Sequence, residues 1–154
     1  MSTIYAPLAI GAASFHSSRF RLRSQSWRGE RLETPDGDAS ASVSGDFDGQ
    51  ADINVSGRAT SSSLLPVLPM HVAASPESSY IGKEGVRIIR LDSLWGTSIE
   101  PGARVFLKVD VQGYEKRVLE GAGRVLPAVM ALELELSFFS LYEGSSLAYE
   151  ILGI

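Results

Sequence analysis

The clearest hydrophobic pattern in the chain is a pair of apolar runs separated by a polar, glycine-containing segment. Residues 103–111, ARVFLKVDV, form a nearly continuous apolar and β-branched run, which is typical of a strand covered on both faces. From Glu115 to Pro127 apolar residues fall at helical spacing, and the proline ends the pattern. Residues 128–136, AVMALELEL, predict another strand. The pattern therefore predicts a β–α–β unit with two parallel strands.

Weaker patterns precede this unit. Alternating apolar and polar residues over 51–55 predict a strand with one buried face. A proline-punctuated stretch indicates an irregular loop with a short helix around residues 64–74. A further strand is predicted over residues 86–89, and Asp92 or Ser93 is predicted to cap a helical turn after it.

The N-terminal part of the chain follows none of these patterns. Residues 12–44 are rich in Ser, Arg and Gly and have little apolar periodicity, which indicates a solvated, poorly ordered segment. Residues 1–45 hold five arginines against four acids, whereas the remainder holds nine basic residues against fourteen acids. This change predicts a boundary near residue 45, between an atypical segment (1–44) and an ordered domain (45–154).

Composition narrows the functional classes. The chain has 154 residues, of which 44% are hydrophobic and 21% charged, as expected of one globular domain. The absence of cysteine excludes disulfides, thiolate zinc sites and thiol nucleophiles, and is consistent with a cytoplasmic protein. The net charge of −4 gives no general attraction to nucleic acid, and no apolar run is long enough to span a bilayer. Two histidines without clustered carboxylates give no metal signature.

Candidate ligand-binding residues follow from the predicted topology, because ligands of parallel α/β sheets bind outside the carboxyl ends of the strands. The positions selected by this rule are Asp110, Gln112, Gly113, Glu115, Glu133 and Glu135. Glu133 and Glu135 share a face, because side chains alternate along a strand. For these two carboxylates and for Asp110, a role in a ligand cleft and a structural role both remain open. The structural roles are a solvated strand end, an ion pair or a helix cap.

Several segments together resemble the FkbM-type methyltransferase family. Residues 107–122, LKVDVQGYEKRVLEGA, resemble the family motif: lysine, aliphatic, Asp, aliphatic, Glu-Gly, any residue, Glu, then a helix ending in Leu-x-Gly-Ala. Gln112 stands where the motif usually has its first glutamate. Residues 45–66 resemble the family's Gly-Asp turn, strand and serine-rich segment. RLDSL at 90–94 and ALELELS at 131–137 resemble the flanking segments.

The resemblance covers residues 45–154 and implies an α/β protein with a partial Rossmann-like class I fold and an incomplete parallel sheet. It also implies S-adenosyl-L-methionine as the cofactor and O-methylation of a small-molecule acceptor, a hydroxyl group of a sugar or secondary metabolite. By the same resemblance, the residues bordering the cofactor are Gly45, Asp46, Asp110, Gln112 and Gly113, and those near the acceptor are Ser61, Ser62 and Ser63.

A catalytic base is expected at this site, because a hydroxyl acceptor is only weakly acidic. Asp110 is the first candidate for the base and Glu133 is the second. His71 is the third, although a packing or surface role is the more common one for a histidine without a partner in the sequence pattern.

The chain departs from the family pattern at the cofactor loop. Family members carry a strand followed by Asp/Glu-x-Gly-x-x-x-Gly, whose glycines let the backbone approach the cofactor, and this pattern occurs nowhere in the sequence. We therefore interpret the chain as the C-terminal part of such an enzyme, with residues 12–44 as an insertion or a mispredicted gene start, and expect little or no cofactor binding. The alternative is a non-catalytic Rossmann-like remnant or interaction module.

Overall fold

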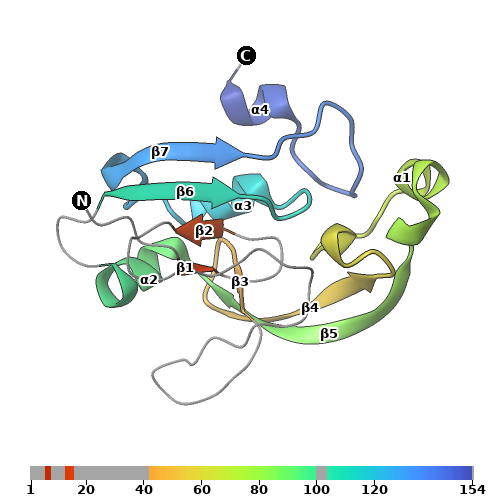
Figure 1. Cartoon of the computed structure of the whole chain (residues 1–154), viewed down its shortest axis with the longest axis horizontal. Helices are drawn as coiled ribbons and strands as arrows, with labels where there is room; N and C mark the ends of the chain where they lie inside the picture. The colour runs from red at the N-terminus through yellow and green to blue at the C-terminus, as the bar shows by residue number, and fades with distance from the viewer. Residues whose placement is uncertain (1–5, 8–12, 16–41, 100–103, 154) are drawn as a thin grey trace.

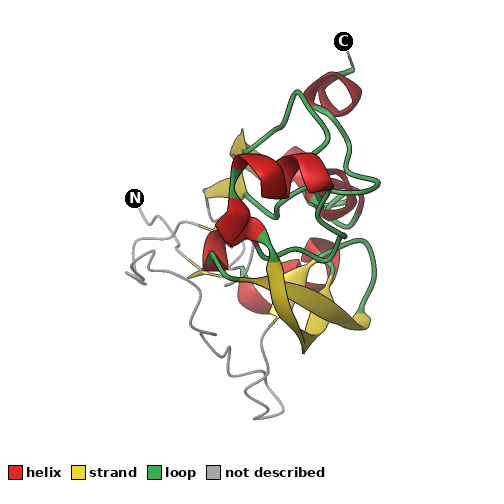
Figure 2. Ribbon diagram, turned by 90° about the vertical axis from the view of Figure 1, so that its right-hand side faces the viewer, coloured by secondary structure: helices red, strands yellow, loops and turns green. Residues whose placement is uncertain are grey.

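Two small sheets and several short helices make up the part of the chain that the computed structural model describes, residues 6–7, 13–15, 42–99 and 104–153 (Figures 1 and 2). The first sheet has the order β1-β2-β6-β7, with strands Ala6–Pro7, Ala13–Phe15, Val105–Val109 and Val129–Leu134. The second has the order β3-β5-β4, with strands Ser42–Ser44, Tyr80–Ile89 and Gly49–Ser56. The α-helices are α1 (Pro69–Ala74), α2 (Leu91–Ser98), α3 (Glu115–Glu120) and α4 (Ala148–Leu152). Short 3-10 helices are η1 (Ala59–Ser61), η2 (Pro76–Ser78) and η3 (Leu126–Ala128).

The predicted β–α–β unit is confirmed. β6 and β7 pair in parallel, with Leu107 opposite Leu132 and Lys108 opposite Glu133, and α3 and η3 lie between them in the chain. The helix is shorter than predicted, because it ends at Glu120 and gives way to a turn before η3. Gly121 follows the helix directly, and glycine is a weak helix former.

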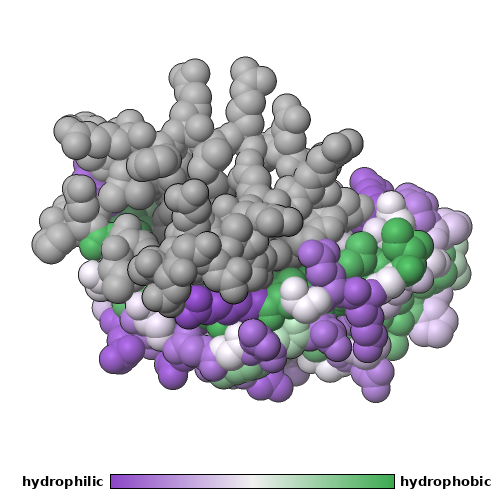
Figure 3. All heavy atoms as spheres, turned by 90° about the horizontal axis from the view of Figure 1, so that it is seen from below, coloured by the Kyte–Doolittle hydropathy of each residue, from purple (hydrophilic) through white to green (hydrophobic). Residues whose placement is uncertain are grey.

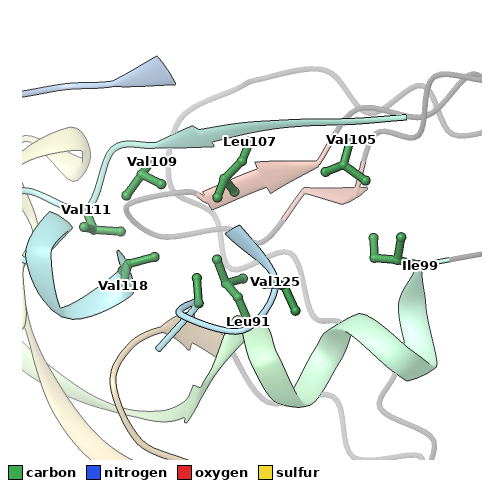
Figure 4. Packing of buried hydrophobic residues seen from close by; sticks show 9 residues of the cluster. Leu91, Ile99, Val105, Leu107, Val109, Val111, Val118 and Val125 are labelled. Carbon is green, nitrogen blue, oxygen red and sulfur yellow. The ribbon is translucent and has the colours of Figure 1, made fainter. Parts of the chain in front are cut away.

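The larger hydrophobic core lies on one face of β6. Figure 4 shows Val105, Leu107 and Val109 pointing from β6 toward Leu91 of α2 and Val118 of α3, and all five side chains are buried. Their burial is what fastens the two helices to the sheet, since each aliphatic side chain removed from water contributes about 1.5–3 kcal/mol.

The expectation that the strand over 103–111 is covered on both faces is wrong, and its neighbour β7 is also exposed. On β6 the side chain of Lys108 is 40% exposed, and on β7 Met130 and Leu132 are 57% and 42% exposed. The physical reason is that α2 and α3 pack against a single face of β6, so a continuous apolar run here marks one buried face and one half-exposed face.

The second sheet carries a smaller core. Val43, Ile53, Val86 and Ile88 come from its three strands and are buried together. The strands predicted over 51–55 and 86–89 are confirmed within β4 and β5, and α1 lies within the short helical segment predicted between them in the chain, around residues 64–74. In Figure 3, which views the molecule from below, the described residues mix hydrophilic and hydrophobic side chains.

The predicted helix cap at Asp92 or Ser93 is wrong. α2 begins earlier, with Arg90 in the N-cap position, so that Asp92 lies inside its first turn. The Asp92 carboxylate instead accepts the backbone N–H groups of Arg124 and Val125, at 3.0 and 3.2 Å, and thereby caps the turn that follows α3.

The boundary predicted at residue 45 stays a prediction, because residues 8–12 and 16–41 lie outside the described ranges. The described pieces of the N-terminal part do pair with the sheets: β2 runs antiparallel to β6, and β3 runs parallel to β5.

α3 and the turn between β3 and β4 meet at two glycines. A Cβ added at Gly121 would lie 1.9 Å from the carbonyl oxygen of Gly45, so the Gly45 backbone leaves no room for a side chain at residue 121. Beside this contact, Asp46 accepts hydrogen bonds from the Arg117 guanidinium (2.9 Å) and from the Tyr114 hydroxyl (3.0 Å). Together these contacts fasten α3 to the second sheet.

The close contact between Gly121 and Gly45 predicts that alanine substitutions at Gly121 and at Gly123 differ in their effect on stability. Gly121→Ala should lower the free energy of unfolding by about 2 kcal/mol or more, because the new methyl group overlaps fixed backbone atoms. Gly123→Ala is the matched control, since its added Cβ would have no closer neighbour than a carbonyl oxygen at 3.7 Å. Urea unfolding of both variants measures the difference, and equal stabilities would contradict the close contact.

Candidate active site

The chain makes a left-handed bend where β6 ends. Gln112 has a φ of 52° and Gly113 a φ of 95°, and Gln112 is the one non-glycine residue with positive φ among the described residues. The conformation costs a non-glycine residue about 1–2 kcal/mol, so other contacts must hold it. Glu115 does so: one of its carboxylate oxygens accepts the backbone N–H groups of Val111 (3.2 Å) and Gly113 (3.1 Å).

Glu115 is buried, with 4% of its surface exposed. Burial raises its pKa above the ordinary value of 4.5, and the backbone hydrogen bonds that it accepts offset part of this effect. A carboxylate with this environment is a structural group, because its oxygen already has two donors within the chain.

Gln112 is fixed by three further contacts. Its side-chain NH2 group donates to Asp110 (Oδ1, 2.9 Å), and its side-chain oxygen accepts from the Tyr142 hydroxyl (2.9 Å). Its backbone carbonyl accepts from the Ser63 hydroxyl at 2.7 Å. The bend therefore connects the end of β6 with two segments that are 49 and 30 residues away in sequence.

Asp110 lies at the carboxyl end of β6, half-buried, with Glu135 beside it after β7. The hydrogen bond between these carboxyl groups is the main cause that raises the pKa of Glu135, and partial desolvation adds to it.

Glu133 lies on the same sheet face but has a partner of its own. The Lys108 ammonium group donates to Glu133 at 2.9 Å, which raises the pKa of Lys108. The side chains are 40% and 53% exposed, so solvent screens this ion pair and its contribution to stability is small.

The serine-rich segment packs against the bend. Ser61, Ser62 and Ser63 are all buried. The Ser62 hydroxyl accepts the backbone N–H of Ser56 at 3.1 Å, and the Ser61 hydroxyl accepts from Ser78 at 3.2 Å. Each of the three hydroxyls therefore has a protein partner, and the segment positions Gln112 through Ser63.

His71 and Tyr142 complete the cluster. The His71 ring meets the Tyr142 ring edge to face, with centroids 5.3 Å apart and planes at 88°. His71 Nε2 lies 3.3 Å from the Ser78 hydroxyl, whereas Nδ1 is buried without a hydrogen-bond partner. Tyr142 is 2% exposed, and burial raises the pKa of its hydroxyl. Sequence reasoning missed Tyr142, because it lies outside the recognised motifs and meets Gln112 only through the fold.

Comparison with known protein families shows which family this chain belongs to. The family model described as the methyltransferase FkbM domain matches residues 7–154. The chain belongs to the FkbM methyltransferase family. Members of this family are S-adenosylmethionine-dependent methyltransferases with a Rossmann-like fold, which agrees with the parallel β6–β7 pair. No similar curated protein and no similar solved structure was found.

The FkbM motif residues occupy both ends of α3. Asp110, Gln112 and Gly113 lie at its start, close to the serine segment and to Tyr142. Gly45 packs against Gly121, directly after α3, and Asp46 contacts the N-cap residue Tyr114 and Arg117 of the same helix. That both groups border one cofactor site stays a prediction.

The residues around Asp46 and those at the end of β6 differ in how well they could hold a ligand. Burial alone would raise the pKa of Asp46, but the hydrogen bonds from Arg117 and Tyr114 outweigh it and hold the pKa below its ordinary value. A ligand at Asp46 would have to displace these protein donors. At the end of β6, the half-buried Asp110 and the exposed Glu135 carry carboxyl groups at the strand ends, which is where ligands bind in parallel α/β sheets.

Two general features bear on partners of this FkbM methyltransferase. Within the described ranges, no helix combines the length and apolar character needed to cross a bilayer. Across the same ranges, no three His, Cys, Asp or Glu side chains are grouped so that they could hold a metal ion.

Glu115 gives a testable account of the bend. Glu115→Ala should lower the free energy of unfolding by about 1–3 kcal/mol, because two backbone N–H groups lose their acceptor. Glu115→Gln keeps an acceptor oxygen and should be close to the wild type in stability.

The same pair of variants tests the raised pKa. Folding raises the pKa of Glu115, so the wild type should lose stability as pH rises from 4.5 through the folded-state pKa. Glu115→Gln should lack this part of the pH dependence. Urea unfolding between pH 4 and 8 is the measurement, and a Gln variant as unstable as the Ala variant would contradict the account.

Proposed function

We propose that this FkbM methyltransferase transfers a methyl group to a hydroxyl group of a small molecule, a sugar or a secondary metabolite, at the carboxyl ends of β6 and β7. The observation that carries the proposal is the hydrogen-bonded chain Asp110–Gln112–Tyr142, which lies where ligands bind in parallel α/β sheets. The family match supports the reaction class, and the acceptor follows from the resemblance of the motif.

Asp110 is the base in this proposal. S-adenosylmethionine, when bound, supplies the methyl group as an electrophile on its sulfonium sulfur. The acceptor hydroxyl would gain the new carbon–oxygen bond as the methyl–sulfur bond breaks and S-adenosylhomocysteine leaves, and its proton would go to a carboxylate oxygen of Asp110. Gln112 binds the other oxygen and keeps the carboxylate oriented, so that the hydroxyl and the base meet in one geometry.

Glu133 and His71 rank behind Asp110. Glu133 is on the same sheet face, but its charge is already paired with Lys108. His71 contacts Tyr142 and Ser78, so the Tyr142 side chain separates it from Gln112. In the same proposal Gln112 and Gly113 border the cofactor, with Gly45 and Asp46 as weaker candidates, and residues 61–63 form the acceptor side.

Affinity for the cofactor should be low. The chain has no Asp/Glu-x-Gly-x-x-x-Gly sequence, whose glycines admit the cofactor close to the backbone in this family. Transfer should therefore be measured at millimolar S-adenosylmethionine, with a labelled methyl group and a panel of monosaccharides and their methyl glycosides as acceptors.

Asp110→Asn is the test of the base. The variant should reduce the methyl-transfer rate about 100-fold or more, because an amide cannot accept the hydroxyl proton. Asp52→Asn is the matched control, since Asp52 is exposed on β4 in the other sheet and should leave the rate unchanged. A variant Asp110→Asn with the wild-type rate would refute the role of Asp110.

A specific observation favours the alternative, a non-catalytic remnant or interaction module. Large apolar side chains are exposed on β7, after it and on α4: Met130, Leu132, Phe138, Phe139, Tyr149 and Leu152. Exposed apolar groups of this kind mark contact surfaces. Calorimetric titration with S-adenosylmethionine separates the two ideas: heat of binding at any concentration up to millimolar supports the enzyme, and its absence together with absent transfer supports the module.

A further inference from the structure

The Tyr142 ring is packed on two sides beside the left-handed bend after β6. A Cβ added at Gly113 would lie 3.0 Å from Cδ2 and 3.3 Å from Cβ of Tyr142, so the bend and the ring are in close contact. On another side the ring meets the His71 ring edge to face, with centroids 5.3 Å apart. Tyr142 is 2% exposed, and a side chain packed in this way has little freedom to change its rotamer.

The backbone of Tyr142 is fixed by the segment that precedes α1. Tyr142 and Val67 form an antiparallel bridge, and the Leu141 carbonyl accepts the backbone N–H of Leu68 at 2.9 Å. Neither contact involves the end of β6. The fold therefore sets the position of the Tyr142 hydroxyl independently of the groups that this hydroxyl reaches there.

The Tyr142 hydroxyl has one hydrogen and two acceptors within reach. The Gln112 side-chain oxygen lies 2.9 Å away and the Ser61 carbonyl 3.3 Å away, so the shorter distance assigns the hydrogen to Gln112. With its oxygen turned to Tyr142, the Gln112 amide directs its NH2 group toward Asp110 and donates to Oδ1 at 2.9 Å. Against a carboxylate, the reversed amide would place two acceptor oxygens at this distance with no hydrogen between them.

We propose that Tyr142 is a positioning residue for the base, whose hydroxyl fixes the orientation of the Gln112 amide and through it the Asp110 carboxylate. With one oxygen held by the amide, the carboxylate is restrained from turning and presents a constant geometry to the acceptor hydroxyl. The inference rests on the proposed function, in which Asp110 accepts the hydroxyl proton. Tyr142 itself touches neither the acceptor nor the cofactor.

The same hydroxyl links the base to the acceptor side of the proposed site. Ser61, whose carbonyl lies 3.3 Å from the hydroxyl, belongs to the buried serine segment, and Ser63 of that segment donates to the backbone carbonyl of Gln112 at 2.7 Å. Tyr142 and Ser63 therefore hold Gln112 by its side chain and by its backbone. The hydroxyl is the group of Tyr142 that acts on the amide, because the other contacts of Tyr142 involve its ring or its backbone.

Three substitutions separate the hydroxyl from the ring and from the amide. Tyr142→Phe removes the hydroxyl and keeps the ring and the backbone pairing. Gln112→Glu keeps the side-chain length, the backbone conformation and an acceptor for Tyr142, but its carboxylate cannot donate to Asp110. Tyr149→Phe on α4 is the matched control, since Tyr149 is 52% exposed.

The first readout is an NMR spectrum of the Gln112 side-chain NH2 group, on the full chain without cofactor. In the wild type and in Tyr149→Phe, this group should show nuclear Overhauser contacts to the Asp110 β-protons and slow exchange with solvent. In Tyr142→Phe the contacts should weaken and the exchange should be about tenfold faster, since the amide loses the hydrogen bond that orients it.

The second readout is a double-variant cycle on the methyl-transfer rate. Tyr142→Phe should lower kcat about tenfold and leave the KM for S-adenosylmethionine unchanged, because the hydroxyl acts through Gln112. In the Gln112→Glu background the amide donor is already gone, so Tyr142→Phe should lower kcat no further. A merely structural role of Tyr142 would instead lower the rate by the same factor in both backgrounds.

Three results overturn the inference. They are wild-type exchange of the Gln112 NH2 group in Tyr142→Phe, additive losses in the double variant, and a wild type whose NH2 group shows no contact to Asp110. The last result decides if Tyr142→Phe does not fold, which circular dichroism would show.

The inference and the proposed function fail separately. Asp110→Asn with the wild-type rate refutes the base, whereas a fully active Tyr142→Phe beside an inactive Asp110→Asn refutes only the positioning role. If no transfer is detected, the NMR readout alone decides whether Tyr142 orients the Gln112 amide toward Asp110.

Discussion

The left-handed bend after β6 is the constraint on which the site depends. Gln112 adopts a backbone conformation that a side chain disfavours, and the buried Glu115 carboxylate pays for it with two backbone hydrogen bonds. The bend directs the Gln112 side-chain amide toward Asp110. It also lets the Gln112 backbone carbonyl accept a hydrogen bond from Ser63. Without it the serine segment, Tyr142 and the end of β6 would have no common partner.

α3 connects this bend to the rest of the molecule. Glu115, in its first turn, holds the bend, while Gly121, directly after its last residue, packs on the backbone of Gly45. Asp46 pairs with Arg117 in the middle of the helix. The six-residue helix α3 thus joins the two sheets and the candidate active site, so a substitution at either end of α3 should affect both the sheet contact and the site.

The sequence predicted the parts of this arrangement that depend on local pattern. Apolar runs located β6 and β7, and Asp110, near the end of the first run, was selected by the strand-end rule. Tyr142 escaped because its role arises from a contact across 30 residues. Gly121 has no signal in the sequence beyond the weak helix propensity of glycine, because its close approach to Gly45 arises only in the fold. Aspartate is a common helix-capping residue, but the turn that Asp92 caps lies 32 residues further along the chain.

The most direct test of the bend is a nuclear Overhauser spectrum of the isotope-labelled chain. The account predicts cross-peaks between the Gln112 side-chain amide protons and the Tyr142 ring, and slow solvent exchange of the Val111 and Gly113 backbone amides. Averaged Gln112 amide signals without any contact to Tyr142, together with fast exchange at both backbone amides, would contradict it.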